Sequence, residues 1–216
     1  MGRHRMTEMT LYTWKHSMAA YRVRVALGLK GITANEIEVD LDASEQFNPD
    51  FLETNPEGAV PALVDSGNTI TQSLAILEYI DERFETPPLL PDDPAGRARV
   101  RALSHLIVSD THPLITHRVG KQFAIADADP ASWRNWCIHW LDRGLKAFEA
   151  RLVNDPRTGL FCHGDSVTIA DICLASLVLL LEHRGYSTHN FPAVSRVIDT
   201  CRTLPPFVDV IPSESQ

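Results

Sequence analysis

AVPALVDSGNTITQSLAILEYIDERF, residues 59–84, is the stretch from which the fold is predicted. Segments 59–65 and 68–71 are rich in apolar and β-branched residues, and the turn sequence DSG lies between them, which is typical of a β-hairpin. Segment 73–84 has apolar residues on one side and acidic residues on the other, which predicts an amphipathic helix. The stretch therefore predicts a hairpin followed by a helix.

The segments that precede this stretch predict a strand, a helix and a second strand. Residues 10–14 are a short strand candidate, and residues 32–41 are a second one. Between them, residues 19–30 alternate apolar and polar side chains, which alone would favour a strand. The helix stop signal Lys30-Gly31 and the need for a crossover between the two strands favour a helix instead. With a short helix over 49–55, this order predicts a small mixed sheet with helices packed on it.

A proline-rich segment predicts a domain boundary. Residues 86–95 (TPPLLPDDPA) hold four prolines, which stiffen the chain and stop any helix. Helical periodicity dominates beyond it, over 96–123, 132–153, 168–183 and 192–203. The predicted division is an N-terminal extension (1–9), an α/β domain (10–86), a Pro-rich linker (87–95) and an all-helical domain (96–216).

Composition excludes several classes of function. The 216 residues include 20 Lys and Arg against 28 Asp and Glu, a formal net charge of −8, which argues against binding to nucleic acid. No apolar run approaches the roughly 20 residues needed to cross a bilayer, and residues 1–9 lack the apolar core of a secretory signal. The four cysteines show no disulfide or zinc spacing, so we expect reduced thiols and a cytoplasmic location.

Five blocks of sequence, in order, resemble the zeta-class glutathione transferases, the maleylacetoacetate and maleylpyruvate isomerases. The blocks are LYTWKHSMAAYRVRVALGLKGI (11–32), NPEGAVPALVDSG (55–67), ITQSLAILEYIDE (70–82), LLPDDPAGRARVR (89–101) and GDSVTIADICL (164–174). The resemblance implies α/β plus all-α architecture: a thioredoxin-like glutathione-binding domain followed by a helical bundle domain. It also implies glutathione as cofactor, a small acidic electrophile as the other ligand, and a homodimer.

The resemblance implies which residues hold glutathione. Gln72-Ser73 ends a strand and opens a helix, whose positive N-terminus suits a carboxylate, and the family binds the γ-glutamyl end there. A plain helix N-cap is the alternative for Ser73. Val60 precedes Pro61; in the family this peptide bond is cis and Val60 offers its backbone to the cysteinyl part, while an ordinary strand-edge proline is the alternative. Gln46 and His112 match further glutathione contacts.

Ser17 is the expected catalytic residue, and it also contacts glutathione in the family. It lies after the first predicted strand and just before the helix predicted from about Ala19, so its hydroxyl is expected beside a positive helix end. A thiol of pKa ~8.5 needs about 1.4 kcal/mol of preferential thiolate stabilisation for each unit of depression. Ser17 corresponds to the first serine of the family's Ser-Ser-Cys motif, whereas Met18 and Ala19 replace the other two residues.

The expected substrate contacts are His16, Met18, Thr116, Arg118 and Arg184. His16 replaces the family's usual arginine by a group that titrates near pH 6.5, and a family arginine further along aligns with His183, beside Arg184. A solvated surface arginine is the alternative for Arg118. A metal site that combines His112 with nearby Asp110 and His117 is improbable, because their spacing does not place all three on one helix face.

The motif Thr168-Ile-Ala-Asp171 is predicted to be structural. It reads as a capping box, in which Thr168 caps the amide three residues on and Asp171 reaches back. In the family it opens the central helix of the second domain. Asp171 is therefore not expected to be a catalytic acid.

Three functions remain open from sequence. The first is a glutathione-dependent cis–trans isomerase of a maleyl-type diacid, acting in the catabolism of aromatic amino acids or aromatic acids by reversible addition of a thiolate. The second is a general transferase or a dehalogenase that consumes glutathione, and the Met18 and Ala19 replacements favour it. The third is a glutathione-binding module without catalysis, against which the presence of Ser17, Gln72 and Ser73 argues.

Overall fold

The computed structural model describes residues 5–126, 129–182 and 185–211. Contacts within the chain divide it into two units, one formed by residues 1–89 together with 204–216 and one formed by residues 90–203. None of the helices in the described ranges is long and apolar enough to cross a membrane.

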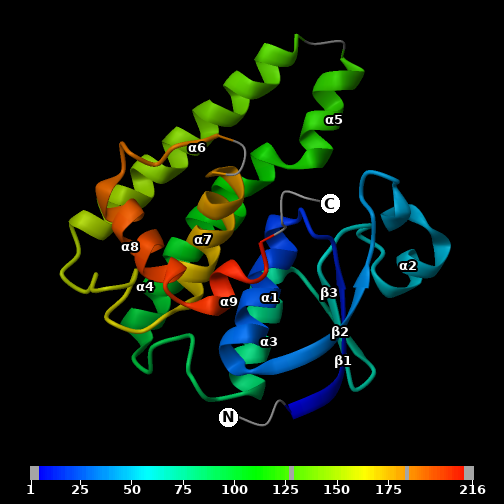
Figure 1. Ribbon diagram of the computed structural model, residues 1–216, viewed down its shortest axis with the longest axis horizontal. Coiled ribbons are helices and arrows are strands. Elements are labelled where there is room, and N and C mark those ends of the chain that lie inside the picture. Colours follow the sequence, from blue (N-terminus) through cyan, green and yellow to red (C-terminus); the bar gives the residue numbers. More distant parts are fainter. Residues whose placement is uncertain (1–4, 127–128, 183–184, 212–216) are drawn as a thin grey trace. The chain divides into compact units, whose positions relative to one another are not determined.

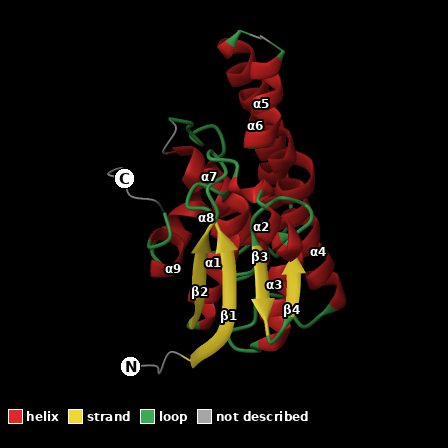
Figure 2. Ribbon diagram, turned by 90° about the vertical axis from the view of Figure 1, so that its right-hand side faces the viewer, coloured by secondary structure: helices red, strands yellow, loops and turns green. Residues whose placement is uncertain are grey.

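The first unit is an α/β layer structure (Figure 1). Its elements are β1 (Arg5–Thr13), α1 (Met18–Lys30), β2 (Ile32–Glu38), a 3-10 turn (Glu45–Phe47), α2 (Pro49–Thr54), β3 (Ala62–Asp65), β4 (Asn68–Thr71), α3 (Ser73–Arg83) and α9 (Pro205–Val208). The strands form one sheet in the order β2-β1-β3-β4, with β1 parallel to β2 and antiparallel to β3 (Figure 2). Helices α1 and α3 cover one face and α2 lies on the other. The predicted hairpin, crossover and following helix are confirmed.

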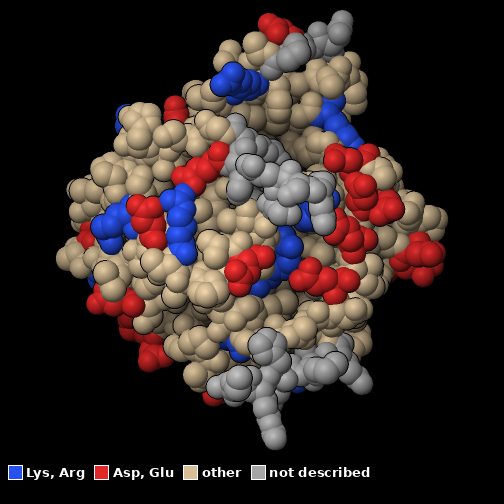
Figure 3. All heavy atoms as spheres, in the orientation of Figure 1, with Lys and Arg blue, Asp and Glu red and all other residues tan. Residues whose placement is uncertain are grey.

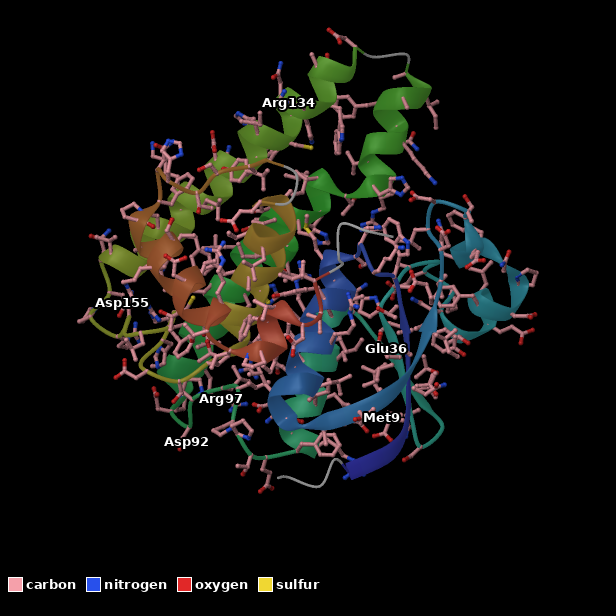
Figure 4. All side chains as sticks on the ribbon, viewed as in Figure 1. Met9, Glu36, Asp92, Arg97, Arg134 and Asp155 are labelled. Carbon is pink, nitrogen blue, oxygen red and sulfur yellow. The ribbon has the colours of Figure 1, made fainter. Side chains whose placement is uncertain are left out.

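The segment with ambiguous alternation is a helix because both of its ends are closed. Ser17 is the N-cap, and Gly31 ends α1 in the left-handed conformation at φ 66°, which glycine adopts at no steric cost. Helix α1 is buried over most of its circumference, so its apolar residues are not confined to one stripe and can alternate with polar ones. Even Arg22 is only 1% exposed. The sheet carries both buried and exposed side chains. Met9 of β1 is buried, whereas Glu36 of the neighbouring strand β2 is exposed; both are labelled in Figure 4.

Lys30 ties three parts of the first unit together. Its side chain is fully buried, and Nζ donates to Asp81 Oδ1 at 2.7 Å and to the carbonyl oxygens of Phe84 and Pro87 at 2.5 Å each. A buried ammonium needs such partners, because they replace the hydration that its three hydrogens lose on burial. The end of α1 is thereby fixed to the end of α3 and to the start of the proline-rich segment.

The second unit consists of helices packed around α7. Its elements are α4 (Pro94–His105), a π-helical segment (Leu106–Thr111), a 3-10 segment (His112–Ile115), α5 (His117–Ile125), α6 (Pro130–Val153), α7 (Ile169–Glu182) and α8 (Pro192–Arg202). Helix α7 packs against α4 and α8, and its residues from Ile169 to Leu179 are buried.

The prediction of one helix over 96–123 is wrong. Helix α4 ends at His105, and α5 begins only at His117. Pro113 lacks a backbone N–H and cannot continue an α-helix. In addition, the Thr111 hydroxyl donates a hydrogen bond to the Leu106 carbonyl oxygen at 2.8 Å. Thr111 also lies so close to α6 that a side chain on Gly144 would collide with it.

The observed units differ from the predicted division at both ends of the chain. Strand β1 begins at Arg5, inside the predicted extension. Residues 204–216, predicted to belong to the helical domain, belong to the first unit. There, Phe207 of α9 is fully buried and its carbonyl accepts a 2.7 Å hydrogen bond from Tyr21 Oη. A local helical pattern carries no information about which unit a terminal segment packs on.

One half of the predicted capping box is confirmed, and the other half is wrong. The Asp171 carboxylate accepts from Thr168 N at 2.8 Å, as predicted, and also from Cys162 N at 2.7 Å. The Thr168 hydroxyl does not cap an amide; it donates to Asp171 Oδ2 at 2.7 Å. Asp171 is fully buried and wholly occupied in holding the start of α7 to the preceding loop.

Candidate functional site

The strand register gathers the predicted glutathione residues of the first unit at one edge of the sheet. Tyr12, near the end of β1, pairs with Ala62 at the start of β3, and Ala62 pairs with Thr71 at the end of β4. The end of β1 leads to Ser17, while Val60 immediately precedes the start of β3. Gln72-Ser73 directly follows β4. Four apolar side chains pack into a cluster beside this edge: Trp14, Val39, Phe51 and Val60.

Ser17 is placed where the sequence predicts it, at the N-terminus of α1. Its Oγ accepts from Ala20 N at 3.2 Å, and its own N–H bonds to Trp14 O at 2.9 Å. The hydroxyl hydrogen has no acceptor within the described residues and can be donated outward. The first turn of α1 carries no acidic side chain that would offset the positive helix end. Together these features can stabilise an anion placed beside Ser17.

Ser73 is not the cap of its helix, which removes the plain N-cap interpretation of its hydroxyl. Gln72 occupies the N-cap position of α3, and Ser73 Oγ accepts from Arg22 Nη1 at 3.0 Å. Both partners are buried, with Ser73 4% and Arg22 1% exposed. Because the guanidinium can only donate, the Ser73 hydrogen is directed elsewhere. The Arg22 guanidinium is therefore bonded to the Ser73 hydroxyl at the N-terminus of α3, and the first turn of this helix carries no acidic side chain.

The loop before β3 offers an open peptide group. The Val60–Pro61 bond is cis, as the resemblance implies. In the described part of the chain, neither the N–H nor the C=O of Val60 is hydrogen-bonded. Asn55 shapes the loop, since its Nδ2 donates to Ala59 O at 2.7 Å and its Oδ1 accepts from Glu57 N at 3.1 Å. An extended peptide can pair with such a backbone as an added strand does.

Gln46 lies against the same loop. Its backbone carbonyl oxygen would lie 3.3 Å from a Cβ placed on Gly58, whose φ of 57° favours glycine. Gln46 is 8% exposed, yet its Oε1 has no hydrogen-bond partner among the described residues. A buried amide oxygen without a partner costs about 1–3 kcal/mol, which a donor from a ligand would offset.

Gln72 has an unusual backbone and a fixed side chain. Its φ of 68° with ψ of 115° is rare for a residue other than glycine, and such conformations cluster at ligand-binding positions. Gln72 Nε2 donates to Glu57 Oε2 at 2.6 Å, and Thr71 Oγ1 donates to Glu57 Oε1 at 3.1 Å. Glu57 thus joins the loop before β3 to the corner that opens α3.

Two residues of this site are missed by the sequence reasoning. Arg22 reads there as one polar member of an alternating pattern, and only its burial reveals a role. Glu57 reads as an exposed acidic residue in a turn, and no local signal distinguishes it from the others.

The predicted substrate residues are divided between the units. His16 is exposed, with its ring edge-on to Trp14 at a centroid distance of 5.3 Å, while Met18 is buried. In the second unit, His112 and Thr116 are half-buried around the break between α4 and α5, and Arg118 is exposed. Arg184 lies outside the described residues, as does His183.

Comparison with known proteins supplies the family. The N-terminal domain model of glutathione S-transferases matches residues 7–82, and the C-terminal domain model matches residues 140–205. A maleylacetoacetate isomerase of Pseudomonas aeruginosa is 38% identical over 208 residues, 95% of this chain and 96% of the relative.

Two solved structures extend the match to three dimensions. One is a holo maleylpyruvate isomerase described as a bacterial zeta-class glutathione S-transferase, 33% identical, with a TM-score of 0.90 over 96% of this chain and all of that one. The other is a maleylacetoacetate isomerase of Methylobacterium extorquens with bound malonate and glutathione, 41% identical, with a TM-score of 0.89 over 93% of this chain and 95% of that one. The chain therefore belongs to the zeta-class glutathione S-transferases, the family of the maleylacetoacetate and maleylpyruvate isomerases.

Proposed function

We propose that this protein is a glutathione-dependent cis–trans isomerase of a maleyl-type diacid, such as maleylacetoacetate or maleylpyruvate, in the catabolism of aromatic amino acids or aromatic acids. The observation that carries the proposal is that the site at the sheet edge belongs to a chain similar over 95% of its length to a maleylacetoacetate isomerase. A cytoplasmic location and a homodimeric state complete the proposal.

The residues of the first unit fit glutathione. The peptide has a γ-glutamyl end with a carboxylate and an ammonium, an internal cysteinyl unit and a thiol. Ser73 at the N-terminus of α3, with Arg22 behind it, suits the carboxylate. The open backbone of Val60 suits the cysteinyl amides, and the orphan Gln46 Oε1 can accept an amide hydrogen. His112 of the second unit is a further proposed contact.

Bound glutathione would supply a thiolate that adds to the conjugated double bond, permits rotation about the resulting single bond and leaves again unchanged. Ser17 would stabilise that thiolate by donating its hydroxyl hydrogen at the positive end of α1. A charge-assisted hydrogen bond contributes roughly 1.5–3 kcal/mol, which is enough to lower a thiol pKa by about one to two units. This is the catalytic role proposed for Ser17.

The diacid substrate requires cationic or neutral donors for its two carboxylates. Arg118 and Arg184 are the proposed cationic contacts, and His16 is a further proposed contact. Thr116 can donate a hydroxyl, and Met18 would supply an apolar wall. Malonate, the ligand in the Methylobacterium relative, is itself a diacid, which supports an acidic substrate class.

A transferase or dehalogenase that consumes glutathione is the second candidate. The observation that favours it is the sequence at the start of α1, where Met18 and Ala19 leave Ser17 as the only hydroxyl of the turn. Fewer polar groups beside the thiol would hold a diacid less firmly.

Whether glutathione is recycled or consumed during turnover distinguishes the two candidates. Maleylacetone, maleylpyruvate and a chloro-nitroaromatic compound are each incubated with the protein, with and without glutathione, while free thiol and fumaryl product are followed over many turnovers. An isomerase keeps free thiol constant while the trans diacid accumulates. Stoichiometric thiol loss supports the second candidate. Binding of glutathione without turnover of any of the three compounds would leave a binding module without catalysis.

A further inference from the structure

The position of Glu57 suggests a role at the γ-glutamyl end of the ligand, and this inference rests on the proposed use of glutathione. Its two carboxylate oxygens are held by neutral donors only, the Thr71 hydroxyl at 3.1 Å and the Gln72 amide at 2.6 Å. The negative charge is therefore fixed in place but not neutralised by these contacts. A carboxylate has about four acceptor positions, so acceptor capacity remains for a further donor.

Within the part of the chain that the structure describes, Glu57 has no cationic partner. No Lys or Arg occurs between residues 31 and 82, and Glu57 has no ion pair with any residue that the structure describes. Exposed acidic residues that precede it in the chain include Asp42, Asp50 and Glu53. Figure 3 shows red carboxylates over the region of α2, on the right-hand side. A positively charged group of a ligand is the natural partner for a carboxylate so placed.

The corner between β4 and α3 is thus polarised. On one side of it, the buried Arg22 donates to Ser73 at the positive end of α3. On the other side, Gln72 is held by the carboxylate of Glu57. A γ-glutamyl group has the matching pattern, since its terminal α-carbon carries one carboxylate and one ammonium.

We propose that Glu57 recognises the α-ammonium of the γ-glutamyl group and makes a free amine a requirement for tight binding. Ser73 and Arg22 would select the adjacent carboxylate. The pair of opposite charges would distinguish glutathione from thiols that carry only a carboxylate at the same end. Glu57 is on this account a specificity-determining residue, remote from the reacting thiol.

The test is a binding experiment on the full chain with two ligands and three proteins. Affinities of the wild type, Glu57→Gln and Glu53→Gln are measured by calorimetry for S-methyl glutathione and for its analogue without the α-amino group. Glu57→Gln keeps an amide oxygen for the Thr71 hydroxyl but removes the charge. Glu53→Gln removes the same charge from the exposed face of α2 and is the matched control. Unliganded melting temperatures show that the variants fold.

We expect Glu57→Gln to weaken S-methyl glutathione about 3- to 5-fold, as for an exposed charge-assisted hydrogen bond, and to change affinity for the desamino analogue less than about twofold. Glu53→Gln should leave both affinities unchanged. Equal weakening of both ligands would assign Glu57 a structural role, and no weakening of either would remove it from the site; each result overturns the inference. If the wild type binds neither ligand, the proposed function itself fails, and the inference fails with it.

Discussion

At the scale of single residues, two serines of the first unit use an oxygen lone pair within the protein and keep a hydrogen for a ligand. Ser17 accepts from the backbone of α1, and Ser73 accepts from a buried arginine on the same helix. Each serine is thereby oriented as a donor at a helix N-terminus. Ser17 does this while it caps α1, whereas Ser73 follows the N-cap residue Gln72 and is held by Arg22 instead.

Ser17→Ala should lower kcat at least ten-fold and raise the pKa of bound glutathione, because the donor to the thiolate is lost. The change also deletes an N-cap, so stability should fall by about 1 kcal/mol. Turnover is measured on a maleyl diacid, and the thiolate is followed by its ultraviolet absorbance as a function of pH.

Ser17→Thr is the control, because threonine retains both the cap and the donor. It should keep the thiol pKa near that of the wild type. Unchanged turnover of Ser17→Ala at neutral pH would show that another group activates the thiol.

At the scale of elements, the loop between α6 and α7 is held by polar side chains. Arg99 of α4 donates to Asp155 at 2.7 Å, to Thr158 at 2.8 Å and to the Cys162 carbonyl at 2.5 Å. Figure 4 labels Asp155 at the start of this loop. Arg157 and Arg99 both bond to Asp155, and Arg157 is the main cause of its lowered pKa. Asp171 anchors the other end of the loop.

His163 of this loop should make stability depend on pH. Arg99 Nη1 lies 3.2 Å from His163 Nδ1, and since arginine can only donate, the imidazole accepts and is neutral. Burial, followed by the charges of Arg99 and Arg157, lowers the pKa of His163. The unfolded chain therefore binds more protons, so this contribution to stability is complete above about pH 6.5 and is lost as the pH falls toward the folded pKa.

The measurement compares the free energy of unfolding of the wild type and His163→Asn between pH 8 and pH 5. Asparagine offers a neutral acceptor that does not titrate, so the difference between the two proteins should shift in favour of the variant as the pH falls. A difference that is constant over this range would contradict the assignment.

Asp171→Asn should destabilise the protein by about 2–3 kcal/mol, because the amide that replaces one carboxylate oxygen would face a backbone N–H from Cys162 or Thr168. Chemical denaturation measures the loss. Asp165→Asn is a control in the same loop, where the exposed carboxylate accepts from Leu160 N and from no other described residue, and it should cost less than about 1 kcal/mol. Activity well below the melting temperature should be retained; a loss of kcat without a loss of stability would indicate a catalytic role for Asp171.

At the scale of the whole molecule, the chain returns to its first unit at the end. Helix α9 contributes Phe207, fully buried, and Pro206 lies within 3.1 Å of where a side chain on Gly28 of α1 would project. The Tyr21 hydroxyl fixes the same segment by its bond to the Phe207 carbonyl. Helix α9 is therefore part of the packing of α1, the helix that begins next to Ser17.

Phe207→Ala should lower the free energy of unfolding by about 3–5 kcal/mol, the usual effect of removing a buried aromatic ring. Val208→Ala is the control, because Val208 is 38% exposed and should cost less than about 1 kcal/mol. Both are measured by urea denaturation. A small effect of Phe207→Ala would mean that α9 is dispensable to the first unit.

The parts of the fold that could be predicted are those set by neighbouring residues. The DSG turn, the glycine that ends α1 and the reach-back of Asp171 all act over a few positions, and the sequence predicts each of them. The predicted helix over 96–123 fails because periodicity persists across Pro113 while the hydrogen bonds do not. The position of Ser17 at a helix end follows from the sequence, and its role stays a prediction.

The sequence by itself determined the order of the elements, the class of sheet and the resemblance that names glutathione, because turn residues, prolines and hydrophobic periods are local signals. Only the tertiary structure decided which polar groups meet. Arg22 and Ser73 are 51 positions apart, and Glu57 and Gln72 are 15 apart. A buried donor or a fixed carboxylate finds its partner through the packing of helices and strands that are distant in sequence, and no local pattern encodes that pairing.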